Sequence, residues 1–168
     1  MTDTDITIRP ACVSNRSIQD YAERVGRHHS IYDDRGRADI DRLIEVLGGT
    51  VEYARSDESL HIRKPGDFTV YIPHFTSSRR DRFTKAHELG HYFLHYLYPK
   101  STGEVVFSHG GVDRAETEAS LFASALLMPA DEFRAAYTEV DGDAWKLAVR
   151  FDVSPRAASV RAQALRLS

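Results

Sequence analysis

Residues 77–97 follow a helical period that Pro99 ends, so the sequence predicts a long helix beginning at position 77 or 78. The pair His87 and His91 lies in the second half of this segment. Residues four apart on a helix share one face and are separated by about 6 Å along the axis. Two imidazoles at this spacing can bind one metal ion, which makes the segment a candidate active-site helix.

Glu88 follows the first of these histidines directly, and apolar residues surround the motif. A carboxylate in this position can accept a proton from water activated by the metal without binding the metal itself. The chain has a single cysteine, Cys12, so a thiolate site is excluded and the ligands must supply nitrogen and oxygen. The motif therefore predicts zinc (Zn²⁺) with Glu88 as the catalytic base.

A catalytic zinc needs a third protein ligand and an open position for water. His95 continues the histidine stripe, but it lies about 12 Å along the axis from His87, which is too far for both to bind one ion. We therefore expect His95 to be a residue of the core or of the cleft edge.

The next predicted helix, 113–128, offers two glutamates. Plotted at 100° intervals, Glu118 falls inside the apolar arc and Glu116 at its margin. A carboxylate that faces a core needs a partner or a cation. We expect Glu118 to be the third ligand. Glu116 remains the alternative, as does a site in which both merely flank the core, in which case His109 is the first residue to test.

The rest of the chain predicts an α+β fold in which a small antiparallel sheet packs on the active-site helix pair, with N- and C-terminal helices around it. We expect helices at 17–25, 37–47, 131–137, 143–151 and 154–167 and strands at 50–54, 59–63, 68–73 and 104–108. Residues 1–16 show no periodicity and are expected to form a mobile arm. Residues 17–168 are expected to form a single domain.

A chain of 168 residues can bury a core without disulfides. No stretch has the roughly 18 apolar residues of a membrane span, and residues 1–10 lack the pattern of a secretory signal. We therefore expect a cytoplasmic protein without membrane contact. The net charge of −3 gives no support to nonspecific nucleic-acid binding by the whole chain.

Three blocks together resemble the ImmA/IrrE family of metallopeptidases. They are residues 82–91 (RFTKAHELGH), residues 118–123 (EASLFA) and residues 126–129 (LLMP). The resemblance covers 48–129 well and extends weakly to the C-terminus. It implies a zincin-like fold, zinc bound by His87, His91 and Glu118, and Glu88 as general base. Ser120 departs from the asparagine usual two positions after the family's ligand glutamate.

The resemblance also implies a regulatory setting. Members of this family cleave helix-turn-helix repressors and so release genes for mobile-element transfer, prophage induction or stress response, and relatives are paired with toxins. We therefore expect a zinc endopeptidase whose partner is a helix-turn-helix repressor or a cognate toxin. The alternative is a non-proteolytic binding module that sequesters a repressor or toxin, or contacts DNA through its C-terminal helices.

The C-terminal segment 141–168 is basic and weakly resembles a helix-turn-helix. We do not expect DNA contact, because the segment needs its apolar residues to pack on the domain. These residues are Leu147, Ala148, Phe151, Val153 and Val160. Segment 68–73 precedes the active-site helix. If it forms an edge strand, its free backbone groups can align an extended peptide beside the metal; the alternative is that it is simply the end of the sheet.

Overall fold

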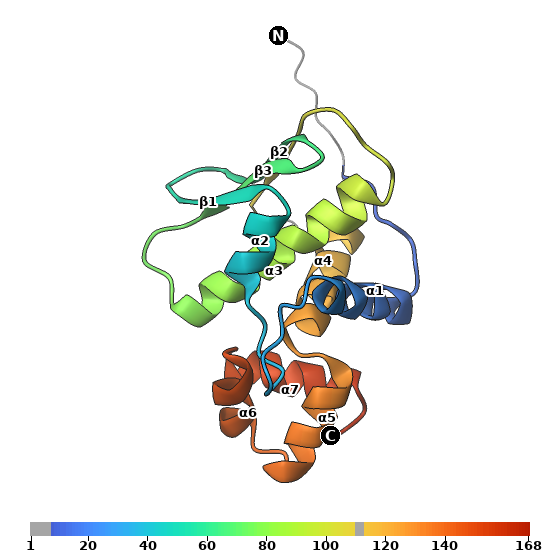
Figure 1. Ribbon diagram of the computed structural model, residues 1–168, viewed down its shortest axis with the longest axis vertical. Coiled ribbons are helices and arrows are strands. Elements are labelled where there is room, and N and C mark those ends of the chain that lie inside the picture. The colour runs from blue at the N-terminus through green and yellow to red at the C-terminus, as the bar shows by residue number, and fades with distance from the viewer. Residues whose placement is uncertain (1–7, 110–112) are drawn as a thin grey trace.

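The computed structural model describes residues 8–109 and 113–168 and has the α+β architecture that the sequence predicts (Figure 1). A four-stranded sheet lies over one long helix, α3 (Ser78–His91). Helices α1 (Asn15–His28) and α4 (Arg114–Leu127) pack on the other side of α3. The three C-terminal helices form a separate layer at the far end. The long helix is thus enclosed between the sheet and the other helices.

Local sequence signals set the first two helices. Ser14 caps α1 by accepting a hydrogen bond from the Ser17 backbone N–H. Helix α2 (Ile40–Val46) is capped in the same way by Asp39 and ends shortly before Gly48. Gly48 has φ +89°, and a Cβ there would lie 1.9 Å from the Gly66 carbonyl oxygen. Only glycine allows the chain to turn from α2 into the sheet here.

The sheet is mixed, which corrects the prediction of a wholly antiparallel one. Its strands are β1 (Gly49–Tyr53), β2 (Glu58–Lys64), β3 (Asp67–Ile72) and β4 (Val105–Ser108), in the order β1-β3-β2-β4. The pairs β2–β3 and β2–β4 are antiparallel, as expected, but β1 pairs with β3 in parallel. Strand β2 runs opposite to the other three strands, and β3 inserts between β1 and β2. The first and third strands therefore run the same way.

Helix α3 continues into a π-helical turn, η1 (Tyr92–Leu97), so 78–97 is helical throughout, as predicted. Gly90 lies where α3 crosses α4. A Cβ at Gly90 would lie 2.8 Å from the Ala119 carbonyl oxygen, so the missing side chain permits this close approach. The crossing brings the histidine face of α3 against the first turns of α4.

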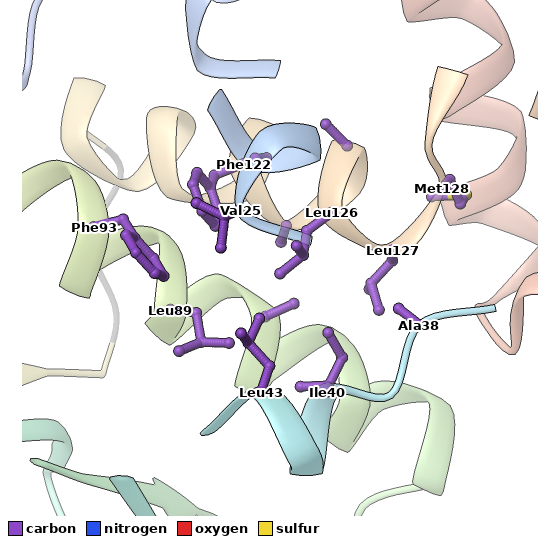
Figure 2. Packing of buried hydrophobic residues seen from close by; sticks show 14 of the residues in the cluster. Val25, Ala38, Ile40, Leu43, Leu89, Phe93, Phe122, Leu126, Leu127 and Met128 are labelled. Atoms are coloured by element: carbon purple, nitrogen blue, oxygen red, sulfur yellow. The ribbon is translucent and has the colours of Figure 1, made fainter. Parts of the chain in front are cut away.

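The hydrophobic core fills the space between α1, α2, α3 and α4 (Figure 2). Leu43 of α2, Leu89 of α3 and Leu126 of α4 meet there, and the rings of Phe93 and Phe122 stack with centroids 5.5 Å apart. The motif helix is therefore held from several sides by apolar contacts.

The described part of the predicted N-terminal arm is packed against this core. Ile8, Ala11 and Val13 contact it, and α1 begins at Asn15. Residues 1–7 of the arm lie outside the described residues. The arm from residue 8 onward is therefore part of the folded domain.

Helices α5 (Ala130–Glu139), α6 (Ala144–Phe151) and α7 (Pro155–Ala164) form the C-terminal layer. Leu147, Ala148, Phe151 and Val153 are buried, as expected, whereas Val160 is 52% exposed. Within the described residues, no helix combines the length and the apolar character that crossing a membrane would need.

Arg82 ties the C-terminal layer to α3. Its guanidinium donates to the Ala38 carbonyl at 3.0 Å and to the Asp152 carbonyl at 3.1 Å. The Asp152 carboxylate lies 3.3 Å from Arg82 and 3.5 Å from Arg79. An internal carboxylate thus balances two of the arginines that crowd the start of α3.

Candidate metal centre

Three side chains from α3 and α4 converge at one point. His87 and His91 project from the same face of α3, with ring centroids 4.9 Å apart. Glu116, from the first turn of α4, places Oε2 2.8 Å from His87 Nε2 and Oε1 3.0 Å from His91 Nε2. One potential ligand atom from each residue lies within 4.8 Å of the other two. Two ligands of a tetrahedral zinc lie about 3.4 Å apart, so this donor set fits such an ion.

The three candidate ligands differ in burial. The His91 side chain is 2% exposed, whereas those of His87 and Glu116 are 16% and 20% exposed. Burial raises the pKa of Glu116, but the hydrogen bonds from His87 and His91 outweigh that effect and lower the pKa to about 2. The carboxylate is therefore ionised and available to a cation, at a site with one open side.

The prediction that Glu118 joins His87 and His91 is wrong. Glu118 is completely buried, and its Oε1 accepts hydrogen bonds from His95 Nε2 at 2.9 Å and from the Ala11 backbone N–H at 2.8 Å. Its Oε2 accepts from the Cys12 backbone N–H at 3.0 Å. Two residues turn a helix by about 200°, so when Glu116 faces the histidine pair Glu118 faces away.

His95 connects the buried glutamate to the histidine pair. His95 Nδ1 lies 2.9 Å from His91 Nδ1, while His95 Nε2 faces Glu118. When His91 presents the lone pair of Nε2 to a cation, its Nδ1–H donates to His95 Nδ1, and the Nε2–H of His95 donates to Glu118. This one set of tautomers satisfies the hydrogen bonds of all three residues, His91, His95 and Glu118. His95 is buried, and it lies outside the group of three residues whose atoms could hold a metal ion.

Glu88, the expected base, is 4% exposed. Burial raises its pKa to about 7, against the opposing effects of the His87 charge and of a hydrogen bond from Ser59. Ser59 Oγ, on β2, donates to Glu88 Oε2 at 3.2 Å. Sequence reasoning missed Ser59, because a serine in a strand carries no signal of the helix residue that it will contact.

Comparison with known proteins identifies the family of the chain. The family model Peptidase_M78, described as the IrrE N-terminal-like domain, matches residues 50–163, well over half of the chain. The chain belongs to this family. The resemblance noted in the sequence is thereby confirmed, and membership supports a peptidase role. No curated protein matches the chain.

In this IrrE N-terminal-like domain, strand β4 contacts the histidine pair. Phe107 of β4 packs on the His91 ring with centroids 5.0 Å apart, and β4 lies at the edge of the sheet. Of the two alternatives for 68–73, the edge strand is excluded, because β3 pairs on both sides, with β1 and β2. The edge that could pair with an extended peptide beside the site belongs to β4.

Two tyrosines near the motif of this family member are engaged elsewhere. The Tyr92 hydroxyl accepts a hydrogen bond from the Gly66 backbone N–H, and the Tyr96 hydroxyl donates to the Gly103 carbonyl. His109 follows β4 and is exposed.

Proposed function

We propose that the protein is a zinc-dependent endopeptidase that cleaves a partner transcriptional repressor. The observation that carries the proposal is the convergence of His87, His91 and Glu116 beside the buried Glu88. These three residues would hold the ion. When bound, zinc supplies a Lewis acid that polarises the scissile carbonyl and lowers the pKa of water.

The chain's own residues supply the proton transfers and the positioning. Glu88 accepts a proton from the water whose oxygen forms the new bond to the carbonyl carbon, and it then gives that proton to the amine as the peptide C–N bond breaks. Ser59 fixes the Glu88 carboxylate by donating a hydrogen bond to Oε2. The apolar burial of Glu88 keeps bulk water from its other sides.

The free edge of β4 offers a way to hold the substrate. An extended peptide can add to this edge through main-chain hydrogen bonds, and such binding tolerates many side-chain sequences. Since Phe107 packs on His91, a peptide along β4 would pass close to the metal ligands.

The biological setting rests on family resemblance. We propose a helix-turn-helix repressor as the substrate and the cytoplasm as the location, with release of gene expression as the outcome of cleavage. A cognate toxin is the alternative partner for a chain that binds without cutting.

The test incubates zinc-loaded protein with candidate helix-turn-helix repressors, beginning with any whose gene neighbours that of this chain, and mass spectrometry follows their cleavage. The parent should cut the partner many times per molecule. Glu88→Gln keeps the shape of the residue but removes the proton acceptor, so it should retain zinc while the rate falls by about 10²- to 10⁴-fold. Equal rates in both proteins would reject Glu88 as the base. A stable one-to-one complex with both chains intact would favour the binding module.

A further inference from the structure

A cleft of about 770 Å³ opens between the start of α3, the middle of α4 and the outer face of α7. This volume lies within the range of small-ligand and peptide side-chain sites. Its walls include apolar groups from all three helices, namely Phe83, Leu121, Pro155, Ala157, Val160 and Ala164. Val160, which we had expected to be buried, is exposed because it faces this cleft.

The cleft adjoins the metal centre through α4. Ser120 lines the cleft, and its hydroxyl lies 3.1 Å from His87 Nδ1, on the side of the ring opposite Nε2. Thr117, the neighbour of Glu116, also lines it. A polypeptide that occupies the metal site can therefore place a neighbouring segment in this cleft.

The charged side chains that line the cleft are all positive. Arg79, Arg80, Arg156 and Arg161 contribute to the walls, and no acidic residue among positions 8–109 and 113–168 does. Arg79 pairs with Asp152, but within the described residues Arg80 and Arg156 form no ion pair and both are exposed. The whole chain carries a net charge of −3, so this local excess of positive charge is a property of the cleft.

Arg161 adds a buried cation to the wall. It is 1% exposed and donates to the Met128 carbonyl and to Gln19, while its Nη2 has no partner in the part of the chain that the structure describes. A guanidinium held beneath an apolar surface adds positive potential there, because few water molecules screen it.

We propose that this cleft binds a segment of the protein substrate in which apolar side chains are flanked by aspartate or glutamate. The apolar walls fit the apolar side chains, and the exposed Arg80 and Arg156 fit the flanking carboxylates. The inference rests on the proposed function, since it names the sequence class that the same site selects. A nucleic-acid duplex would match the arginines but not a concave, largely apolar surface.

The test measures binding separately from cleavage. Two fluorescein-labelled peptides of equal length are compared on the Glu88→Gln protein with zinc. The first has the sequence Asp-Glu-Leu-Phe-Leu-Asp-Glu, and the second has lysine at every acidic position. The acidic peptide should bind at least about tenfold more tightly, and the double variant Arg80→Glu, Arg156→Glu should abolish or reverse this preference.

A matched control is the double variant Arg16→Glu, Arg35→Glu, which makes the same change in net charge at exposed positions outside the cleft. It should keep the preference. The proposal would be overturned if the Glu88→Gln protein bound the two peptides equally tightly. It would also be overturned if both double variants lost the preference for the acidic peptide to the same extent. Tighter binding of a DNA duplex that depends on Arg80 and Arg156 would overturn it as well. If the preference holds while the partner protein is never cut, the proposed protease function fails and the cleft assignment stands.

Discussion

The candidate metal centre has an outer and an inner side, built by α3 with its continuation η1 and by α4. The outer side consists of His87, Glu116 and Ser120, which are partly exposed. The inner side consists of His91, His95 and Glu118, which are buried. The difference separates two tasks: the outer side leaves access for an ion and a substrate, and the inner side fixes the geometry.

The two histidines differ most in what supports their Nδ1 atoms. His87 has a single hydroxyl, from Ser120. His91 has His95, which in turn contacts Glu118, and Glu118 is held by backbone N–H groups of the N-terminal segment. Hydrogen bonds in a dry interior are stronger and costlier to lose than those near solvent. Loss of the hydrogen bonds that support His91 should therefore weaken the site more than loss of the hydrogen bond that supports His87.

The largest expected effect comes from replacing the outer glutamate. The free energy of zinc binding at structural sites with four ligands is about 10–16 kcal/mol, which is roughly 3–4 kcal/mol for each ligand. Losing one ligand in Glu116→Gln should therefore weaken zinc binding by about 10²- to 10³-fold. Glu118→Gln keeps all three ligands and should weaken binding by about tenfold to a hundredfold at most. Competition with a chromophoric chelator measures both affinities.

Unfolding of the metal-free proteins in urea should show the reverse order. Glu118→Gln sets an amide N–H₂ against donors that need an acceptor, so it should lower the free energy of unfolding by about 1–3 kcal/mol. Glu116 is partly exposed, and its replacement should cost less than about 1 kcal/mol. If Glu118→Gln lost more zinc affinity than Glu116→Gln, the assignment of the two sides would be reversed.

The exchange of roles between these glutamates shows what the sequence can reveal about the site. The helical wheel correctly places Glu118 inside the apolar arc and Glu116 at its margin. The inference that a buried carboxylate needs a partner is also correct, but that partner is His95 and not the metal. The contact between Gly90 and Ala119 sets the rotation of α4 relative to α3, and periodicity within one helix does not contain it.

In the fold, too, local features are predictable from the sequence and contacts between distant segments are not. Helices and strands are predicted within a few residues, because caps such as Ser14 and breaks such as Gly48 are local signals. The parallel pairing of β1 with β3 is not predictable in this way. It depends on which strand inserts between two others, and that is decided by contacts between distant parts of the chain.

A smaller effect should follow from changes at His95. His95→Phe removes the acceptor for His91 Nδ1–H and the donor to Glu118, so zinc affinity should fall by about tenfold to a hundredfold. His95→Gln can still accept with its amide oxygen and donate with its amide nitrogen. It should recover most of the affinity, which a merely space-filling role would not explain. Equal affinities for the two variants would show that His95 acts only through packing.

The smallest effect is expected at Ser120. Because His87 is 16% exposed, water can take the place of the lost hydroxyl in Ser120→Ala, and zinc affinity should fall by less than about tenfold. Ser120→Asn restores an acceptor for His87 Nδ1–H and should match the parent if the added atoms fit the cleft. The same chelator competition compares these variants with His95→Phe. If Ser120→Ala lost as much zinc affinity as His95→Phe, water would not be replacing the lost hydroxyl on the outer side. The outer and inner sides of the site would then not differ in the way described above.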